Sequence, residues 1–216
     1  MANLIYSGIT SLDGYIADDN GSFQWSTPSD DVHAAVNDFQ RSIGTYLYGR
    51  GLYEVMSAWE TMPLENQSAV IVDYANIWRQ ADKIVYSRTL ATPVSEHTRI
   101  EREFDPHTVA MMKAALGSDL LIGGANLGAQ ALRAGLVDEI HQYLSPVIVG
   151  GGKRFLPKGL HLHLALLDER CFSNGVVQLS YQVLRPVGGD GDEDEDEDDG
   201  ADDRHDAIGD LPASDG

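Results

Sequence analysis

The chain has 216 residues, of which 43% are hydrophobic and 23% charged, a composition that can form one hydrophobic core of ordinary size. Its formal net charge is −19, but residues 187–216 carry 14 of the 34 acidic side chains and one of the 15 Lys and Arg, which leaves the first 186 residues at −6. This charge argues against nucleic-acid binding, which requires clustered Lys and Arg. The single cysteine, Cys171, excludes an internal disulfide and a cysteine-based zinc site.

The sequence has no recognisable secretion or membrane signal. The N-terminus, MANLIYSGIT, lacks a basic region followed by an apolar segment and a cleavage site, and no run approaches the roughly 20 apolar residues of a membrane span. We therefore expect a soluble cytoplasmic protein that binds neither membrane nor nucleic acid.

Strand-like and helix-like segments alternate along the chain, which predicts an α/β fold with a mainly parallel sheet. The first half contains a predicted strand at 3–9, a turn at Asp13-Gly14, a helix at 30–43, a strand at 45–49, helices at 51–59 and 68–81, and strands at 83–87 and 98–103. Ser29 is the expected N-cap of the first helix. For 68–81, the apolar pattern would also fit a strand.

The second half contains a predicted helix at 106–116, a strand at 119–123, a helix at 126–135 with Asn126 as a candidate N-cap, and a long strand at 137–150. Two further strands, 160–173 and 175–184, meet at Ser173-Asn174-Gly175, which is a hairpin signal. We therefore expect an antiparallel pair beside the parallel sheet, and one folded domain over residues 1–186.

Residues 187–216 have a different character from the rest of the chain. They contain very few apolar side chains and a dense negative charge, so they cannot bury enough surface to offset the entropy of ordering. This composition predicts a disordered acidic tail. A tolerated terminal extension is the favoured interpretation, and a segment for solubility or partner binding is the alternative.

The pair Gly123-Gly124 separates a predicted apolar strand from a predicted helix. Such a junction places unpaired backbone N–H groups and the positive end of a helix dipole at the carboxyl edge of the sheet. Glycine lets a bulky anion approach the main chain, so the junction suits phosphate. A tight turn without a ligand is an equal alternative, because the sequence matches neither named phosphate-binding motif.

Two other predicted strands are followed directly by arginine. Arg50 comes after the strand at 45–49, and Ser87, Arg88 and Thr89 come after the next strand. Ligands of open α/β sheets bind beyond the carboxyl ends of the strands, and guanidinium and hydroxyl groups recognise phosphate. Each arginine alone is typical of a solvated surface. Together with the glycine pair they favour a polyphosphate cofactor.

Five segments in order carry a resemblance to a known family: SLDGYIA (11–17), YGRGLYE (48–54), KIVYSRTL (83–90), GGANLGAQAL (123–132) and AGLVDEIHQYLSPVIVGGGKRFLP (134–157). Together they resemble the dihydrofolate-reductase-like superfamily. Within it they are most similar to the family of the C-terminal reductase domain of the bifunctional riboflavin-biosynthesis deaminase-reductase. The resemblance covers residues 3–185.

The resemblance implies an eight- or nine-stranded mixed sheet flanked by helices, NADPH as hydride donor, and a homodimer. By position, Ser87 and Arg88, with Thr89 beside them, would hold the adenosine 2′-phosphate, and Arg50 would add charge near the phosphates. The pyrophosphate would be cradled by the glycine junction and the helix start that follows it, namely Gly123, Gly124, Ala125, Asn126 and Leu127. One departure is Leu52, where many members of the family have a threonine.

The substrate side of the expected site starts from proton transfer. Reduction of a C=N or C=O bond leaves an atom that needs a proton, so a carboxylic acid or a relayed water is expected. The stretch at 25–36 is similar to the Trp-x-x-Pro-x-Asp segment of true dihydrofolate reductases, which makes Asp30 the candidate proton donor and Trp25 a candidate stacking residue. Asp13 is an auxiliary candidate. The alternatives are a helix-start carboxylate for Asp30, a turn residue for Asp13 and a core residue for Trp25.

The glycine-rich segment after the long strand is a candidate for substrate binding. Gly152, Lys153 and Arg154 could bind an anionic substrate, and a plain glycine hairpin is the equal alternative. No metal site is expected, because His161 and His163 have no third ligand at suitable spacing.

The sequence therefore predicts an NADPH-dependent reductase of a small heterocyclic or carbonyl substrate, of which a ribosylaminopyrimidine of riboflavin biosynthesis is the family's best-known example. The chain lacks the His/Cys zinc signature of the deaminase, so a stand-alone paralogue that acts on a different substrate is an open alternative. The alternatives are true dihydrofolate reduction and a non-catalytic nucleotide-binding module whose acidic tail binds a partner.

Overall fold

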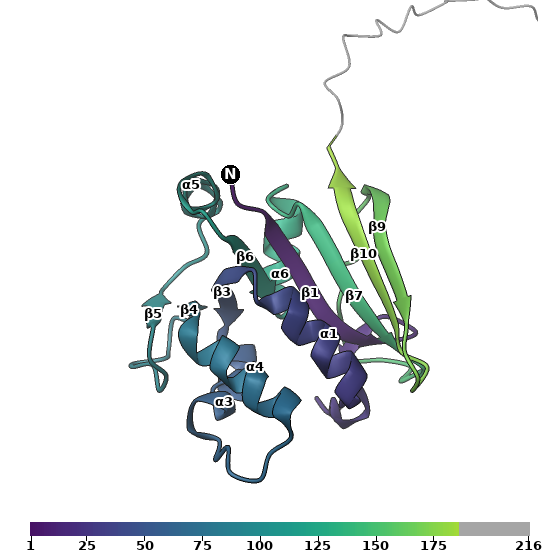
Figure 1. Cartoon of the computed structure of the whole chain (residues 1–216). Coiled ribbons are helices and arrows are strands. Elements are labelled where there is room, and N and C mark those ends of the chain that lie inside the picture. The colour runs from purple at the N-terminus through teal and green to yellow at the C-terminus, as the bar shows by residue number, and fades with distance from the viewer. Residues whose placement is uncertain (186–216) are drawn as a thin grey trace, which may run out of the picture. The chain divides into compact units, whose positions relative to one another are not determined.

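An eight-stranded sheet forms the centre of the computed structural model, which describes residues 1–185 (Figure 1). Its strands are β1 (Leu4–Ser11), β3 (Ile43–Gly49), β4 (Asp82–Tyr86), β5 (Thr98–Glu101), β6 (Asp119–Gly123), β7 (Glu139–Ser145), β9 (His163–Cys171) and β10 (Val177–Leu184). Their order is β5-β4-β3-β6-β1-β7-β10-β9. The first six in this order are parallel, and β10 pairs in the antiparallel direction with both of its neighbours, β7 and β9. The predicted α/β fold with a C-terminal antiparallel hairpin is confirmed.

Helices cover both faces of this sheet, because neighbouring residues of each strand point to opposite sides. The helices are α1 (Asp30–Gln40), α2 (Arg50–Met56), α3 (Ala58–Thr61), α4 (Ala69–Gln80), α5 (Pro106–Ala115) and α6 (Ala125–Arg133). In β1, Leu4 and Tyr6 pack with apolar residues of α5 and α6, whereas Ile5 joins the cluster that contains Trp78 of α4. Figure 1 shows α1 and α4 beside each other over one face of the sheet. A short 3-10 helix (Gln24–Ser26) precedes α1, and a separate two-stranded sheet pairs β2 (Tyr15–Ala17) with β8 (Lys153–Arg154).

Most predicted elements are present, and the differences have local causes. The segment at 68–81 is the helix α4, which settles the choice left open by its apolar pattern. The predicted strand at 137–150 ends at Ser145, because Pro146 has no N–H to donate to a neighbouring strand. The predicted strand at 98–103 ends at Glu101, so Arg102 lies beyond it. The predicted N-cap Asn126 is wrong, since Gly124 occupies that position.

Tyr6, in the central strand β1, determines how closely two other segments approach the sheet. Its ring is fully buried and stacks on Phe155 with 4.2 Å between the ring centroids, and its hydroxyl donates to the Phe155 carbonyl at 2.8 Å. Helix α6 crosses the same ring at Gly128, where an added Cβ would lie 2.3 Å from Tyr6 Cε2. Glycine at position 128 therefore permits the close packing of α6 on β1.

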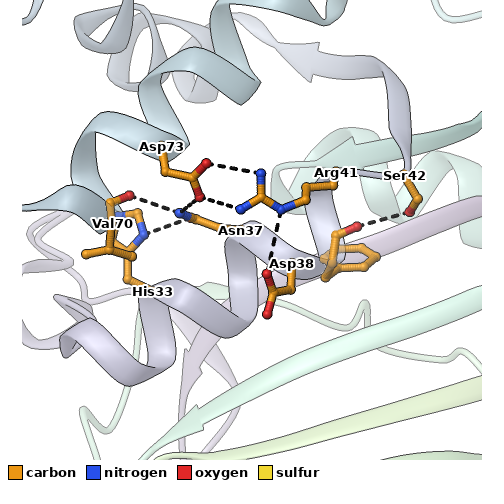
Figure 2. Close-up of polar contacts among 8 residues, drawn as sticks. His33, Asn37, Asp38, Arg41, Ser42, Val70 and Asp73 are labelled. Atoms are coloured by element: carbon orange, nitrogen blue, oxygen red, sulfur yellow. Dashed lines mark hydrogen bonds and ion pairs between the residues drawn. The ribbon is translucent and has the colours of Figure 1, made fainter.

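A polar network joins α1 to α4 (Figure 2). The buried Asn37 donates through Nδ2 to the Val70 carbonyl at 2.9 Å and to Asp73 Oδ2 at 2.7 Å. The two carboxylate oxygens of Asp73 also accept from the guanidinium of Arg41, at 3.0 and 2.8 Å. His33 Nδ1 lies 3.0 Å from Asn37 Oδ1. These contacts fix the position of α1 relative to α4, since each buried polar group has a defined partner.

The beginning of α1 is attached to the C-terminal hairpin through Asp31. Ser29 occupies the predicted N-cap position, but its hydroxyl donates to Asp31 Oδ1 at 2.5 Å and caps no backbone amide. The amide and hydroxyl of Ser173, in the hairpin turn, donate to Asp31 Oδ2 at 3.2 and 2.9 Å. These hydrogen bonds lower the pKa of Asp31 to about 2, and the bond from the Ser29 hydroxyl has the largest effect. The carboxylate is therefore bound more favourably in the folded chain than in the unfolded chain.

We expect Asp31→Asn to destabilise the protein near neutral pH and to have a smaller effect in acid. The folded-state pKa of about 2 lies below the usual 3.8, so the stabilisation is present above 3.8 and is lost as the pH falls through about 2. Urea unfolding of both proteins between about pH 7 and pH 2 measures the difference. Asp30→Asn is the matched control, because Asp30 shares the first helical turn but is exposed. An Asp31→Asn effect that is independent of pH would contradict this account.

Two further sequence-based expectations concern the acidic tail and membrane-spanning helices. The predicted acidic tail falls on residues that lie outside the described range, 1–185. Within that range, no helix combines the length and apolar content that crossing a bilayer requires.

Candidate functional site

A cleft of about 1290 Å³ lies at the carboxyl ends of β3, β4 and β6 and along the middle of β1. Its wall includes the strand ends Gly49, Tyr86 and Gly123 together with residues of α1, α2, α4, α6 and β8. The volume exceeds the usual 300–1,000 Å³ of a site for one small molecule. The cleft is therefore large enough for two ligands side by side, in the position where open α/β sheets bind ligands.

The N-terminus of α6 faces this cleft without a capping side chain. Gly124 precedes the helix with φ of +92°, and no side chain accepts a hydrogen bond from the first helical turn. The side chain of Asn126 accepts from Gln130 Nε2 at 2.8 Å, so it does not cap the helix. Because the first amides of a helix have no partner within it, those of residues 125–127 are available to an anion. The structure thus brings all of the predicted cradle residues to the cleft: Gly123, Gly124, Ala125, Asn126 and Leu127.

Leu52 of α2 explains why position 123 is glycine. A Cβ at Gly123 would lie 2.5 Å from Leu52 Cδ2, so the leucine occupies the space that a larger residue would need. Leu52 also lines the cleft, where the resemblance led us to expect a hydroxyl in many relatives. This part of the wall is therefore apolar.

A hydrogen bond joins Arg50 and Thr89, which follow the neighbouring strands β3 and β4. Arg50 Nη1 donates to Thr89 Oγ1 at 2.6 Å, and Arg50 Nε donates to Glu54 at 2.6 Å. Arg50 lines the cleft, whereas Thr89 does not. Thr89 thus orients Arg50 rather than facing the cleft itself.

Ser87 and Arg88 also line the cleft, as predicted. Ser87 is buried, and its hydroxyl accepts from the Leu90 amide at 3.0 Å. The Arg88 side chain is 80% exposed and forms an ion pair with Glu103 at 3.4 Å. An exposed pair of this kind contributes about 0–1 kcal/mol, so Arg88 can exchange its partner at little cost.

Sequence reasoning missed a third arginine of the cleft, Arg102. Its Nη1 donates to the carbonyl of Ser87 at 3.0 Å and to that of Leu90 at 2.7 Å, and the residue lines the cleft. The signal that could have found it is the one that found Arg50 and Arg88, an arginine directly beyond a strand. It was hidden because the predicted strand included Arg102.

The segment around β8 supplies another part of the wall. Lys153 lines the cleft, as predicted, together with Phe155. Gly152 does not line the cleft. Its φ is +121°, and an added Cβ would lie 2.1 Å from the Ala17 carbonyl oxygen, so glycine at this position permits the close packing of β8 against β2. Arg154 lies outside the lining, with its guanidinium 4.9 Å from the centre of the Tyr15 ring. Of these three predicted substrate residues, the structure brings only Lys153 to the cleft.

The two predicted catalytic carboxylates do not line the cleft. Asp13 accepts from the amides of Val149 and Gly150 at 3.2 and 2.8 Å. A hydrogen bond from the Ser11 hydroxyl, supported by these amides, lowers its pKa, so Asp13 is ionised at neutral pH and holds two loops together. Asp30 is exposed at the start of α1.

Trp25 is also outside the lining, and its indole N–H is buried without a partner among the described residues. Phe23 and Ser26, which lie close to Trp25 in the sequence, do line the cleft. The predicted stacking role of Trp25 therefore gains no support from its position.

The part of the cleft beside α1, called the recess below, was not predicted from the sequence. It combines the apolar side chains of Ile9 and Val36 with the polar groups of Gln40, Tyr74 and Tyr143. Burial raises the pKa of the Tyr143 phenol to about 12, and the pKa of Tyr74 is raised by the same cause. Both phenols thus stay protonated at neutral pH. Their positions follow the spacing of core residues, so nothing in the sequence distinguishes them.

Carboxylates are scarce in the cleft. Among the described residues that line it, Glu103 is the one acidic side chain, and it belongs to the arginine end. Within residues 1–185, no three His, Cys, Asp or Glu side chains are grouped so that they could hold a metal ion.

Comparison with known proteins identifies the family. The sequence model described as the RibD C-terminal domain matches residues 2–178. The chain belongs to the RibD C-terminal domain family. The uncharacterized protein YyaP of Bacillus subtilis strain 168 is 30% identical to it over 173 residues, which cover 79% of this chain and 89% of YyaP. The family predicted from the five sequence segments is thus confirmed.

Solved structures show the same fold at low identity. A candidate riboflavin biosynthesis protein of Shewanella sp. PV-4 has a TM-score of 0.67 and 20% identity, with 86% of this chain and 100% of that chain covered. A pyrimidine reductase-like protein of Corynebacterium diphtheriae has a TM-score of 0.63 and 15% identity, with 85% and 92% covered. A diaminohydroxyphosphoribosylaminopyrimidine deaminase/5-amino-6-(5-phosphoribosylamino)uracil reductase of Thermotoga maritima has a TM-score of 0.59 and 14% identity, with 85% of this chain and 57% of that chain covered.

We expect Gly124→Ala to destabilise the protein by about 1–3 kcal/mol, because an L-residue is strained at the φ of +92°. The strain is in the backbone, since the nearest atom to the new Cβ would be Leu52 Cβ at 3.8 Å. Urea unfolding measures the change. Gly51→Ala is the control: it has no atom within 4 Å of the added Cβ and lies in a helix, so it should be neutral or stabilising. A Gly124→Ala variant as stable as the parent would show that this φ is not required.

Proposed function

We propose that the protein is an NADPH-dependent reductase that transfers a hydride to a small heterocyclic or carbonyl substrate. The observation that carries this proposal is the convergence of the uncapped N-terminus of α6 with Arg50, Arg88 and Arg102 at one end of the cleft. Membership of the RibD C-terminal domain family supports the same reaction class, since the Thermotoga maritima structure of this fold is described as a uracil reductase.

The residues at this end of the cleft fit a dinucleotide that carries an additional phosphate. The amides of residues 125–127 would hold the pyrophosphate, because they are unpaired and lie at the positive end of a helix. Ser87 and Arg88 would hold the 2′-phosphate, and Arg50 would add charge between the two sites. When bound, NADPH supplies the hydride.

The recess beside α1 fits a flat substrate with polar edges. Tyr74 and Tyr143 would offer two phenols, and Gln40, whose Oε1 accepts from the Tyr46 hydroxyl, would add its amide; Ile9 and Val36 would contact the faces of a ring. The raised pKa values of the phenols let them donate hydrogen bonds without losing a proton. With no carboxylate in the recess, we propose that solvent delivers the proton that the reduced atom requires. This arrangement gives less support to dihydrofolate reduction, for which Asp30 was the expected acid.

A homodimer is a second part of the proposal. The outer strand β9 carries Leu164, Leu166 and Leu167, whose exposed fractions are 38%, 53% and 50%. An edge strand also has unpaired backbone groups, so this strand is suited to contact a second copy of the chain. Light scattering should give twice the chain mass for the parent and the single chain mass for Leu166→Glu. A monomeric parent would contradict the dimer and leave the reductase proposal intact.

We expect NADPH to bind more tightly than NADH, and Arg88→Met to reduce the affinity for NADPH by about 10- to 100-fold with little effect on NADH. The reason is that the lost charge-assisted hydrogen bonds serve only the 2′-phosphate. Calorimetric titration of the full chain measures both affinities, and Arg133→Met, at the far end of α6, is the control.

Turnover is measured as NADPH oxidation with a panel that includes the phosphoribosylaminouracil named above, dihydrofolate and simple carbonyl compounds. Removal of residues 188–216 should leave turnover unchanged. Equal binding of the two nucleotides with a silent Arg88→Met would contradict the proposed cofactor, and loss of all binding on removal of the tail would favour a tail-dependent binding module.

A further inference from the structure

Two chain segments leave the sheet side by side at the arginine end of the cleft. Strands β4 and β5 are parallel and pair Tyr86 with Glu101, and the Ser87 amide donates to the Glu101 carbonyl at 2.9 Å. Residues 87–90, which follow β4, therefore lie against residues 102–104, which follow β5. The predicted phosphate-binding residues belong to the first of these segments.

Arg102 holds the segment 87–90 in its shape. One nitrogen of its guanidinium donates to the carbonyls of Ser87 and Leu90, the first and last residues of the segment. The Ser87 hydroxyl accepts from the Leu90 amide at 3.0 Å and so supports the same conformation from inside. Removing Arg102 would release both ends of the segment that presents Arg88.

The three arginines of the cleft differ in how their charge is used. Arg50 has an ion pair with Glu54, and Arg88 has one with Glu103. Arg102 has only neutral carbonyl partners among the described residues, through a single nitrogen. Its positive charge and its remaining N–H groups are thus available to a ligand in the cleft that it lines.

Glu103 has the opposite effect. It lines the cleft beside Arg102, its side chain is 75% exposed, and it occupies Arg88 through a contact of 3.4 Å. A carboxylate in this place repels a phosphate and competes with it for the Arg88 guanidinium. The ion pair is weak because both side chains are exposed, so a doubly charged phosphate can displace it.

We propose that Arg102 is a positioning and specificity residue for a ribose 2′-phosphate, which replaces Glu103 as the partner of Arg88. Arg102 fixes the segment 87–90 and adds a charge that is not paired with a carboxylate of residues 1–185. This inference rests on the proposed NADPH dependence and names the residues that produce the preference.

The test compares two nucleotide fragments that differ by the phosphate in question. Adenosine 2′,5′-bisphosphate and adenosine 5′-monophosphate are titrated into the full chain by calorimetry. For Arg102→Met we expect the affinity for the bisphosphate to fall about tenfold or more, while that for the monophosphate stays within about twofold. Arg102→Lys should be intermediate, since an ammonium keeps the charge but lacks the planar fork. Arg99→Met, on β5 and outside the cleft, is the control.

Glu103→Gln provides a test that keeps both hydrogen bonds from Arg102 to the segment 87–90. We expect it to bind the bisphosphate more tightly than the parent and the monophosphate equally well. This variant decides the question if thermal unfolding shows that Arg102→Met does not fold. Equal losses for both fragments in Arg102→Met, or no gain in Glu103→Gln, would overturn the inference. If the parent itself binds both fragments equally, the proposed NADPH dependence fails instead.

Discussion

The packing of Tyr6 sets the dimensions of the cleft. Its ring contacts two other segments that line the cleft, α6 at Gly128 and the segment after β8 at Phe155. The hydroxyl of Tyr6 donates to the Phe155 carbonyl, so this hydrogen bond and the ring stacking together fix the position of the ring. Gly128 lets α6 pack directly against this ring, and the ring prevents a closer approach. This contact therefore holds the uncapped N-terminus of α6 at the edge of the sheet. The proposed anion site and the β8 wall therefore both depend on the buried ring of Tyr6.

The electrostatics of the cleft depend on partners that are present before any ligand. Arg50 is oriented by Glu54 and Thr89, and Arg88 by Glu103. Both pairs are exposed, so they hold the guanidinium groups in place but could be exchanged at little cost for the phosphate that we propose. Arg102 is different, because its partners are carbonyls of the chain that it supports. One end of the cleft thus carries three arginines, which suits the polyanion that we propose, while the recess beside α1 contains uncharged polar groups.

The sequence was sufficient for the fold and for the backbone of the site, and insufficient for its side-chain detail. Residues 123–127 and Arg88 could be predicted because glycine before a helix and arginine beyond a strand have a physical meaning that needs no tertiary information. The position of Asp30 could not be predicted, because Asp30 and Asp31 are adjacent in the first turn of α1. A shift of one residue decides which carboxylate contacts the hairpin and which faces solvent. Tyr143 was hidden for another reason, since its spacing is that of a core residue.

The central claim is that the amides beyond β6 and the segment beyond β4 bind one dinucleotide together. Nuclear magnetic resonance of the ¹⁵N-labelled full chain with added NADP⁺ tests it most directly. The account predicts that the largest shifts occur together at the amides of residues 124–127 and 87–90, with the same dissociation constant at both places. Shifts confined to one of these segments, or concentrated away from the carboxyl ends of β4 and β6, would contradict it.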